Sequence, residues 1–84
     1  MRTVVLYTRE GCCLCDEVRK ILARLHERDP AAFDWHERDI DSDDRLHQAY
    51  LERIPVVTID GEEAFELQVD ESELERRLDI VGTG

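Results

Sequence analysis

The chain has 84 residues, 42% of them hydrophobic and 38% charged, which fits one small domain over residues 1–84 and leaves no room for a second. Its 21 acidic and 11 basic side chains give a formal charge of -10, which argues against nucleic-acid and membrane binding. The apolar runs are too short for a transmembrane helix, and no apolar signal segment follows Arg2. We therefore expect a cytoplasmic protein that works as a monomer.

The first two predicted elements are a strand and a helix. Residues 3–8 are rich in β-branched residues and apolar in their middle, which predicts a central strand covered on both faces. Apolar residues then recur at helical spacing, at Leu14, Val18, Ile21, Leu22 and Leu25. This stripe predicts an amphipathic helix, which Asp29 and Pro30 end.

The middle of the chain predicts an edge strand and a short helix. Residues 33–41 contain apolar residues among many charges, which is typical of a strand at the edge of a sheet. Ser42 followed by two aspartates is a helix-start signal. An apolar stripe of about two and a half turns follows, at Leu46, Ala49 and Tyr50.

The last third of the chain predicts a β-hairpin and a helix. Asp60 and Gly61 join two strand-like runs and suit the positive φ angles of a type I′ turn. Asp70 with Glu73 resembles a capping box, from which a helix is predicted to continue through Leu78 to Gly82. The order β-α-β-α-β-β-α predicts an α/β fold, a three-layer α/β/α sandwich around a four-stranded mixed sheet.

Three cysteines, Cys12, Cys13 and Cys15, lie between the first predicted strand and helix. This clustering points to chemistry, because it cannot form a disulfide framework. A helix N-terminus stabilises a thiolate, so Cys12 is the predicted nucleophile, with a pKa below the free value of about 8.5. Cys15 faces the same side of the first turn and can resolve a mixed disulfide on Cys12. Cys13 points away from both and receives no catalytic role.

The runs "VVLYTREGCCLC" and "RIPVVTIDG", with the second and terminal helices, resemble the glutaredoxin-like branch of the thioredoxin-fold proteins over nearly the whole chain. The resemblance implies a Cys-x-x-Cys thiol–disulfide oxidoreductase that serves electron transport and cell redox homeostasis. It also implies that Pro55 forms a cis peptide bond beside the dithiol and that Arg9 binds substrate. A cis bond would leave the amide and carbonyl of Ile54 available to an extended substrate strand.

The sequence also departs from glutaredoxins that use glutathione. The usual Gly-Gly pair near the last helix is absent, since residues 65–70 read "FELQVD", and the cysteines enclose Cys13 and Leu14. Arg9 and Arg53 are the basic groups expected near the site, and each can bind a carboxylate. We expect no tightly bound cofactor and no metal site, and glutathione is expected to bind weakly. The reductant is glutathione or another thiol, or thioredoxin reductase, and the substrate is a disulfide-containing protein or a small thiol compound.

Two other functions remain open from the sequence. The first is a non-catalytic thioredoxin-fold module that binds a partner protein through the same groove. The second is an iron–sulfur carrier that holds a cluster between two chains through Cys12 and added thiols. A zinc site is disfavoured, because His26, His36 and His47 lack ligand-like spacing to the cysteines or to one another.

Overall fold

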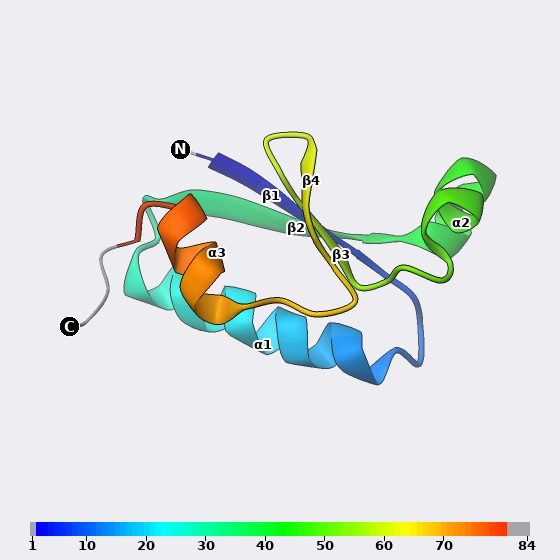
Figure 1. Ribbon diagram of the computed structural model, residues 1–84, viewed down its shortest axis with the longest axis horizontal. Coiled ribbons are helices and arrows are strands. Elements are labelled where there is room, and N and C mark those ends of the chain that lie inside the picture. The colour runs from blue at the N-terminus through cyan, green and yellow to red at the C-terminus, as the bar shows by residue number, and fades with distance from the viewer. Residues whose placement is uncertain (1, 81–84) are drawn as a thin grey trace.

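The computed structural model describes residues 2–80 and contains a mixed sheet with helices packed around it (Figure 1). The elements are β1 (Arg2–Thr8), α1 (Cys13–Arg28), β2 (Phe33–Asp39), the 3-10 turn η1 (Ile40–Ser42), α2 (Asp44–Tyr50), β3 (Val56–Ile59), β4 (Glu62–Glu66) and α3 (Glu71–Arg77). Within residues 2–80, no helix combines the length and the apolar character needed to cross a membrane. The predicted α/β order of elements is confirmed.

The sheet has the strand order β2-β1-β3-β4, so β1 is central as predicted and β2 lies at an edge. β1 pairs in parallel with β2 and antiparallel with β3, while β3 pairs antiparallel with β4. The β3–β4 turn has φ angles of 53° at Asp60 and 87° at Gly61, which are the positive angles of the predicted type I′ hairpin. The sheet is therefore mixed, as the predicted order of elements requires.

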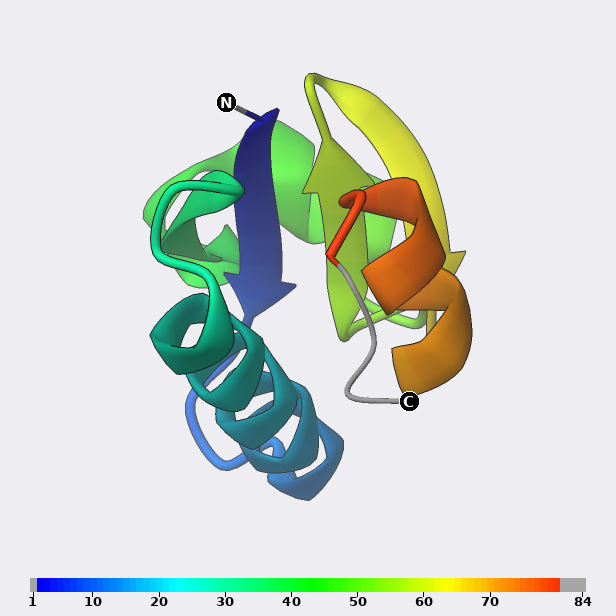
Figure 2. The same cartoon turned by 90° about the vertical axis from the view of Figure 1, so that its left-hand side faces the viewer.

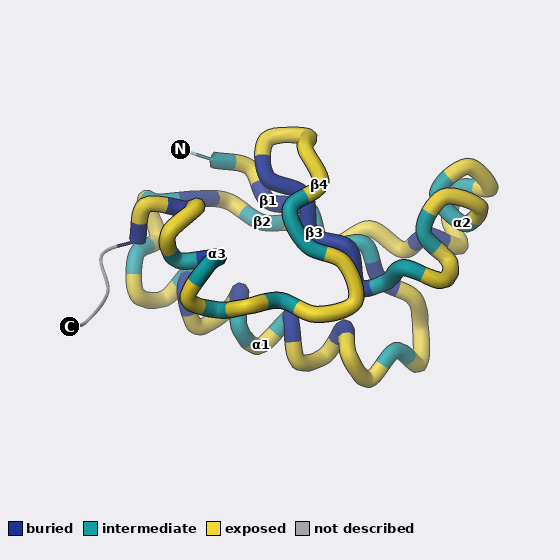
Figure 3. Tube along the Cα trace, viewed as in Figure 1, coloured by how far each residue is buried: buried dark blue, intermediate teal, exposed yellow. Residues whose placement is uncertain are grey.

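Helices α1 and α3 pack on the same core side of the sheet, and in Figure 2 α1 lies below β1 while α3 lies at the right, in front of β4. The buried core between them and the strands consists of Val4, Leu6, Val18, Leu22, Leu25, Phe33, Val57, Ile59, Leu74, Leu78 and Ile80. Along β1 the buried positions alternate with half-buried ones. Along α1 the buried residues recur at helical spacing among mostly exposed ones, and Figure 3 shows them as dark blue bands on a largely yellow tube. Burial on this face anchors the N-terminus of α1 to the sheet.

The opposite face of β1 is only partly covered, so the predicted burial on both faces is wrong. Thr3 is exposed, while Val5 and Tyr7 are half-buried. The third layer is supplied by α2, which has no buried residue and meets the sheet near the end of β1. Tyr50 packs against Tyr7 there, with ring centroids 4.7 Å apart. A seven-residue helix is too short to cover a whole sheet face, which explains the exposure.

Two helix boundaries differ from the predicted ones. Asp43, rather than Ser42, caps α2, because its carboxylate accepts a hydrogen bond from the amide of Arg45 at 2.8 Å. Helix α3 ends at Arg77 instead of continuing toward Gly82, which lies outside the described residues. Asp79 adopts φ 58° and donates its amide to Arg76, while the Ile80 amide donates to Glu75. These two bonds form a Schellman motif, which stops the helix.

Candidate redox site

Cys12 and Cys15 form a disulfide at the N-terminus of α1, and their Cα atoms lie 5.3 Å apart. That separation falls within the usual range for a disulfide. Cys13, between them, is a free and exposed thiol. The pair is the one that the shared helix face of the outer cysteines predicts.

The loop before α1 aims Cys12 at the helix terminus. Gly11 has φ 82°, a left-handed conformation that favours glycine, and the Cys12 amide donates to the carbonyl of Arg9 at 3.2 Å. Cys12 itself is the N-cap, and its Sγ accepts a hydrogen bond from the amide of Cys15 at 3.2 Å. The sulfur therefore lies where the helix dipole and unpaired amides favour negative charge.

The three cysteines differ in exposure. Cys15 is fully buried at 0% exposure, Cys12 is half-buried and Cys13 is exposed. An external thiol or disulfide can therefore reach Cys12 but not Cys15. Cys12 therefore has the accessible sulfur of the pair, and Cys15 has the buried one.

Leu14, between the two cysteines, does not join the apolar stripe of α1 as predicted. It is 53% exposed, and Cys15 takes the buried position at this end of the helix. The deviation follows from helix geometry: Cys15 continues the buried stripe of Val18, Leu22 and Leu25, and Leu14 lies at the edge of that stripe, about 100° around the helix from Cys15. An apolar side chain therefore lies in solvent directly beside the disulfide.

The Ile54–Pro55 peptide bond is cis, and it lies next to the cysteine loop. Because Val56 pairs with Tyr7 in the antiparallel β1–β3 ladder, the preceding residue Pro55 falls opposite Thr8, from which that loop departs. The Ile54 amide donates to the carbonyl of Tyr50 at 3.0 Å. The expectation that both backbone groups of Ile54 are available to a substrate strand is therefore wrong for its amide.

Arg9, predicted to bind a substrate carboxylate, is paired within the chain. Its Nε donates to a carboxylate oxygen of Asp41 at 3.0 Å. The other oxygen of Asp41 lies 3.5 Å from Nε2 of His47. A substrate carboxylate would have to compete with Asp41 for Arg9.

Arg53 holds the segment before the cis proline against β4. Its Nε lies 2.6 Å from Glu66, its Nη2 contacts Glu63, and its guanidinium lies 5.3 Å from the ring centroid of Tyr50. The hydrogen bonds that Arg53 donates to Glu66 and Glu63 raise its pKa, while burial raises the pKa of Tyr50. Because its guanidinium already binds two carboxylates, Arg53 stabilises the fold and offers little positive charge to a ligand.

A groove beside the disulfide was not predicted as a site from the sequence. It has a volume of about 280 Å³ and lies between α1 and the segment that connects β4 to α3. Its lining residues are Leu14, Glu17, Val18, Ile21, Leu67, Gln68 and Val69. We call it the Leu14–Leu67 groove. The sequence signal was the "FELQVD" segment, which stands where glutathione-dependent relatives have glycines.

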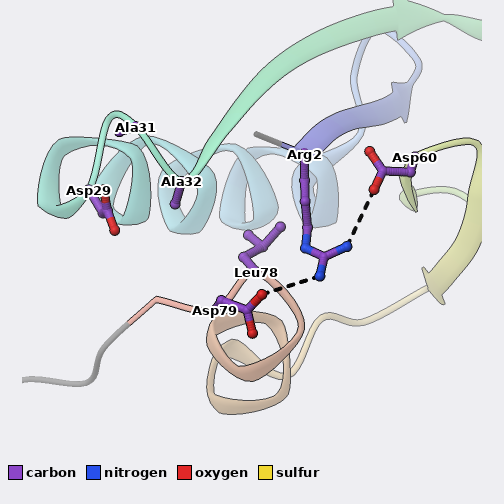
Figure 4. Close-up of a pocket in the computed structure, with 7 residues that line it drawn as sticks. All are labelled: Arg2, Asp29, Ala31, Ala32, Asp60, Leu78 and Asp79. Atoms are coloured by element: carbon purple, nitrogen blue, oxygen red, sulfur yellow. Dashed lines mark hydrogen bonds and ion pairs between the residues drawn. The ribbon is translucent and has the colours of Figure 1, made fainter.

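Another hollow, of about 440 Å³, lies near the opposite end of α1 and is shown in Figure 4. Arg2 in its wall bonds to Asp60 at 3.4 Å and to Asp79 at 3.2 Å. Asp29, at the C-terminal cap of α1, also lines it. Since α1 has 16 residues, about 24 Å of helix separates this hollow from the cysteines. It is therefore no part of the redox site.

Comparisons with known proteins find relatives of similar sequence and fold. A protein of Mycobacterium tuberculosis, itself uncharacterized, is 37% identical over 82 residues, which cover 92% of this chain and 80% of that protein. A structural-genomics target protein from X. campestris is 31% identical with a TM-score of 0.73, covering 94% of this chain and 99% of that one.

The fold is also that of thioredoxin. A mutant thioredoxin from Halobacterium salinarum superposes with a TM-score of 0.68 at 20% identity, covering 93% of this chain and 72% of that one. A thioredoxin-like fold with a neighbouring cysteine pair supports a redox role. Residues 3–79 match the glutaredoxin-like domain DUF836. The chain therefore belongs to this glutaredoxin-like family.

Proposed function

We propose that this protein is a thiol–disulfide oxidoreductase in which Cys12 attacks the substrate and Cys15 resolves the intermediate. The observation that carries the proposal is the unequal exposure of the two sulfurs at the N-terminus of α1. The accessible Cys12 sulfur meets the substrate, and the buried Cys15 sulfur meets only what Cys12 has already bound.

The reaction consists of two exchange steps. In the reduced protein, the Cys12 thiolate attacks one sulfur of a substrate disulfide, forms a mixed disulfide and releases the other sulfur as a thiolate, which takes up a proton. The Cys15 thiol then loses its proton, and the thiolate attacks Cys12 Sγ. The second substrate thiolate leaves and is protonated. Two electrons pass to the substrate, and the protein ends with the Cys12–Cys15 disulfide.

An external dithiol returns the protein to its reduced form by the reverse exchange and is itself oxidised to a disulfide. We assign this role to a dithiol protein, such as a thioredoxin reductase, ahead of glutathione. Arg9 and Arg53 are already paired with carboxylates, so they offer little attraction to the carboxylates of glutathione. A reducing compartment such as the cytoplasm suits a dithiol enzyme of this kind.

The test compares Cys12→Ser and Cys15→Ser, each reduced and mixed with a peptide disulfide. We expect Cys15→Ser to accumulate a mixed disulfide on Cys12, because the resolving thiol is missing. Cys12→Ser should form none on Cys15, which is fully buried. Intact-protein mass spectrometry and peptide mapping detect the adduct and its position. An adduct on Cys15 in Cys12→Ser would reverse the assignment, and wild-type protein that stays reduced would favour a non-catalytic binding module.

A further inference from the structure

We propose that the Leu14–Leu67 groove selects the substrate: it binds a polypeptide that carries an apolar side chain next to its reactive cysteine and a lysine or arginine beside it. The inference rests on the proposed redox function and names its substrate class. The groove begins at Leu14, between the two redox cysteines, and follows α1 as far as Ile21. A chain whose cysteine meets Cys12 therefore lays its neighbouring residues along the groove.

Exposed leucines give the groove its apolar character. Three large apolar residues are exposed within residues 2–80, and two of them line this groove: Leu14 at 53% and Leu67 at 48%. They come from segments more than fifty residues apart in the sequence, so their meeting is a property of the fold. Together with the half-buried Ile21 and Val69, they form a surface that an apolar side chain can cover.

The backbone of Leu67 is fixed in an uncommon conformation. Its φ is 67°, a left-handed angle that residues with a side chain rarely adopt. The Leu67 amide donates to the carbonyls of Arg53 at 3.1 Å and Pro55 at 2.9 Å. The backbone of Leu67 is thereby bonded to the segment that contains Pro55, while its exposed side chain lines the groove. Strain of this kind concentrates at functional sites.

Charge around the groove favours a cationic partner. Glu17 lines the groove, and its ion pair with Lys20 spans 3.6 Å between two side chains that are both about 70% exposed, so it holds Glu17 weakly. The nearby arginines, Arg24 and Arg53, are paired with Glu71 and with Glu63 and Glu66. Glu17 is thus available to a lysine or arginine of the substrate.

The same charges argue against two other occupants. A second copy of this chain would bring another formal charge of -10 to an acidic surface. A small anionic thiol would meet Glu17 and cover only part of a groove of about 280 Å³. A polypeptide with an apolar and a cationic side chain satisfies both the leucines and the glutamate.

The experiment uses symmetrical disulfides of short capped peptides with the core sequences Leu-Cys-Lys, Leu-Cys-Glu and Ser-Cys-Lys. Reduced protein is mixed with excess peptide, and the second-order rate constant of its oxidation is measured in a single turnover at low salt. We expect the Leu-Cys-Lys peptide to react about five- to tenfold faster than the other two. Mass spectrometry of quenched samples supplies the readout.

Three variants assign the preference to the groove. Glu17→Lys should abolish or invert the preference for lysine over glutamate. Its matched control is Glu27→Lys, which makes the same charge change on an exposed residue about 15 Å farther along α1 and should preserve the preference. Leu67→Asn keeps a residue type that tolerates positive φ and should slow the leucine peptides about fivefold while leaving Ser-Cys-Lys unchanged.

The outcomes separate the two proposals. Equal rates for all three peptides, or the same loss of preference in Glu27→Lys as in Glu17→Lys, would overturn the groove inference and leave the redox function standing. Absence of oxidation by every peptide would overturn the redox function itself. Light scattering on the reduced protein completes the test, since a dimer that dissociates in Leu67→Asn would assign the groove to a second copy of the chain.

Discussion

At the scale of single residues, Cys12 does the work of a capping side chain and of a reactive sulfur at once. Helix N-caps are usually serine, threonine, aspartate or asparagine, whereas here Sγ accepts the amide of Cys15. A thiolate accepts such a bond more strongly than a disulfide sulfur does. The cap therefore favours the ionised form of Cys12 in the reduced protein, which is the form that attacks a disulfide.

Cys13 provides the first prediction at this scale. Its thiol is exposed and lies outside the Cys12–Cys15 pair, so Cys13→Ser should keep the single-turnover oxidation rate within about twofold of wild type. Peptide mapping after oxidation of the wild-type protein should find Cys12 linked to Cys15 and Cys13 free. A dominant intramolecular bridge containing Cys13 would contradict the pairing.

The ion-pair partners of the two arginines could not be predicted from the sequence. Both Arg9 and Arg53 were recognised as basic groups near the cysteines, yet their ion pairs with Asp41 and Glu66 join residues 32 and 13 positions apart. Such partners depend on tertiary geometry, which no local pattern encodes. The exposure of Leu14 has a different origin: the predicted apolar stripe leaves out Cys15, which is buried and moves the centre of the stripe away from Leu14.

At the scale of elements, α1 joins the core to the redox site. Its buried side packs on the sheet through Val18, Leu22 and Leu25, while its N-terminus carries the cysteines. Because the helix is packed on the core, the position of Cys12 at its N-terminus is fixed relative to the sheet. Burial of this face, rather than intrinsic helix propensity, supplies most of its stability.

A pair of leucine substitutions in α1 tests that division. Leu22 is fully buried, so Leu22→Ala should lower the free energy of unfolding by about 2–5 kcal/mol. Leu14→Ala, at a residue 53% exposed in the same helix, should change it by less than about 0.5 kcal/mol. Urea unfolding of the oxidised proteins, followed by circular dichroism, measures both. A comparable loss from the two substitutions would mean that the Leu14 side chain packs on the core.

Elements with strong local signals were predictable, and their ends were less so. The Asp60–Gly61 hairpin and the Asp70 cap of α3 follow from residue types that those backbone angles and bonds require. The end of α3 was not predicted, because an aspartate, Asp79, takes the left-handed position that glycine usually marks. The prediction places the helix end at Gly82, the next glycine along the chain, which is five residues beyond Arg77.

At the scale of the whole molecule, the excess of acidic side chains is not offset at the redox site. Most basic side chains of the described residues are engaged in ion pairs, including Arg9 in the loop before the cysteines and Arg19 in α1. The formal charge of -10 therefore leaves a negative potential around Cys12 that extends over a Debye length. This potential acts on the encounter with any charged thiol before contacts are made.

Salt dependence of reduction by small thiols tests this potential. The glutathione thiolate carries two carboxylates and one ammonium and is net negative, whereas the cysteamine thiolate is net neutral. Both should reduce the Cys12–Cys15 disulfide, and raising the ionic strength from about 0.01 to 0.15 M shortens the Debye length from about 30 to 8 Å. We expect the glutathione rate to rise about three- to tenfold over this range, since screening removes a repulsion.

Stopped-flow measurement of disulfide loss at matched thiolate concentrations gives both rates. The cysteamine rate is the control and should stay unchanged within about twofold. A glutathione rate that falls with salt would instead mean that Arg9 or Arg53 leaves its carboxylate partner and attracts the tripeptide, and Arg9→Ala and Arg53→Ala would identify which one does.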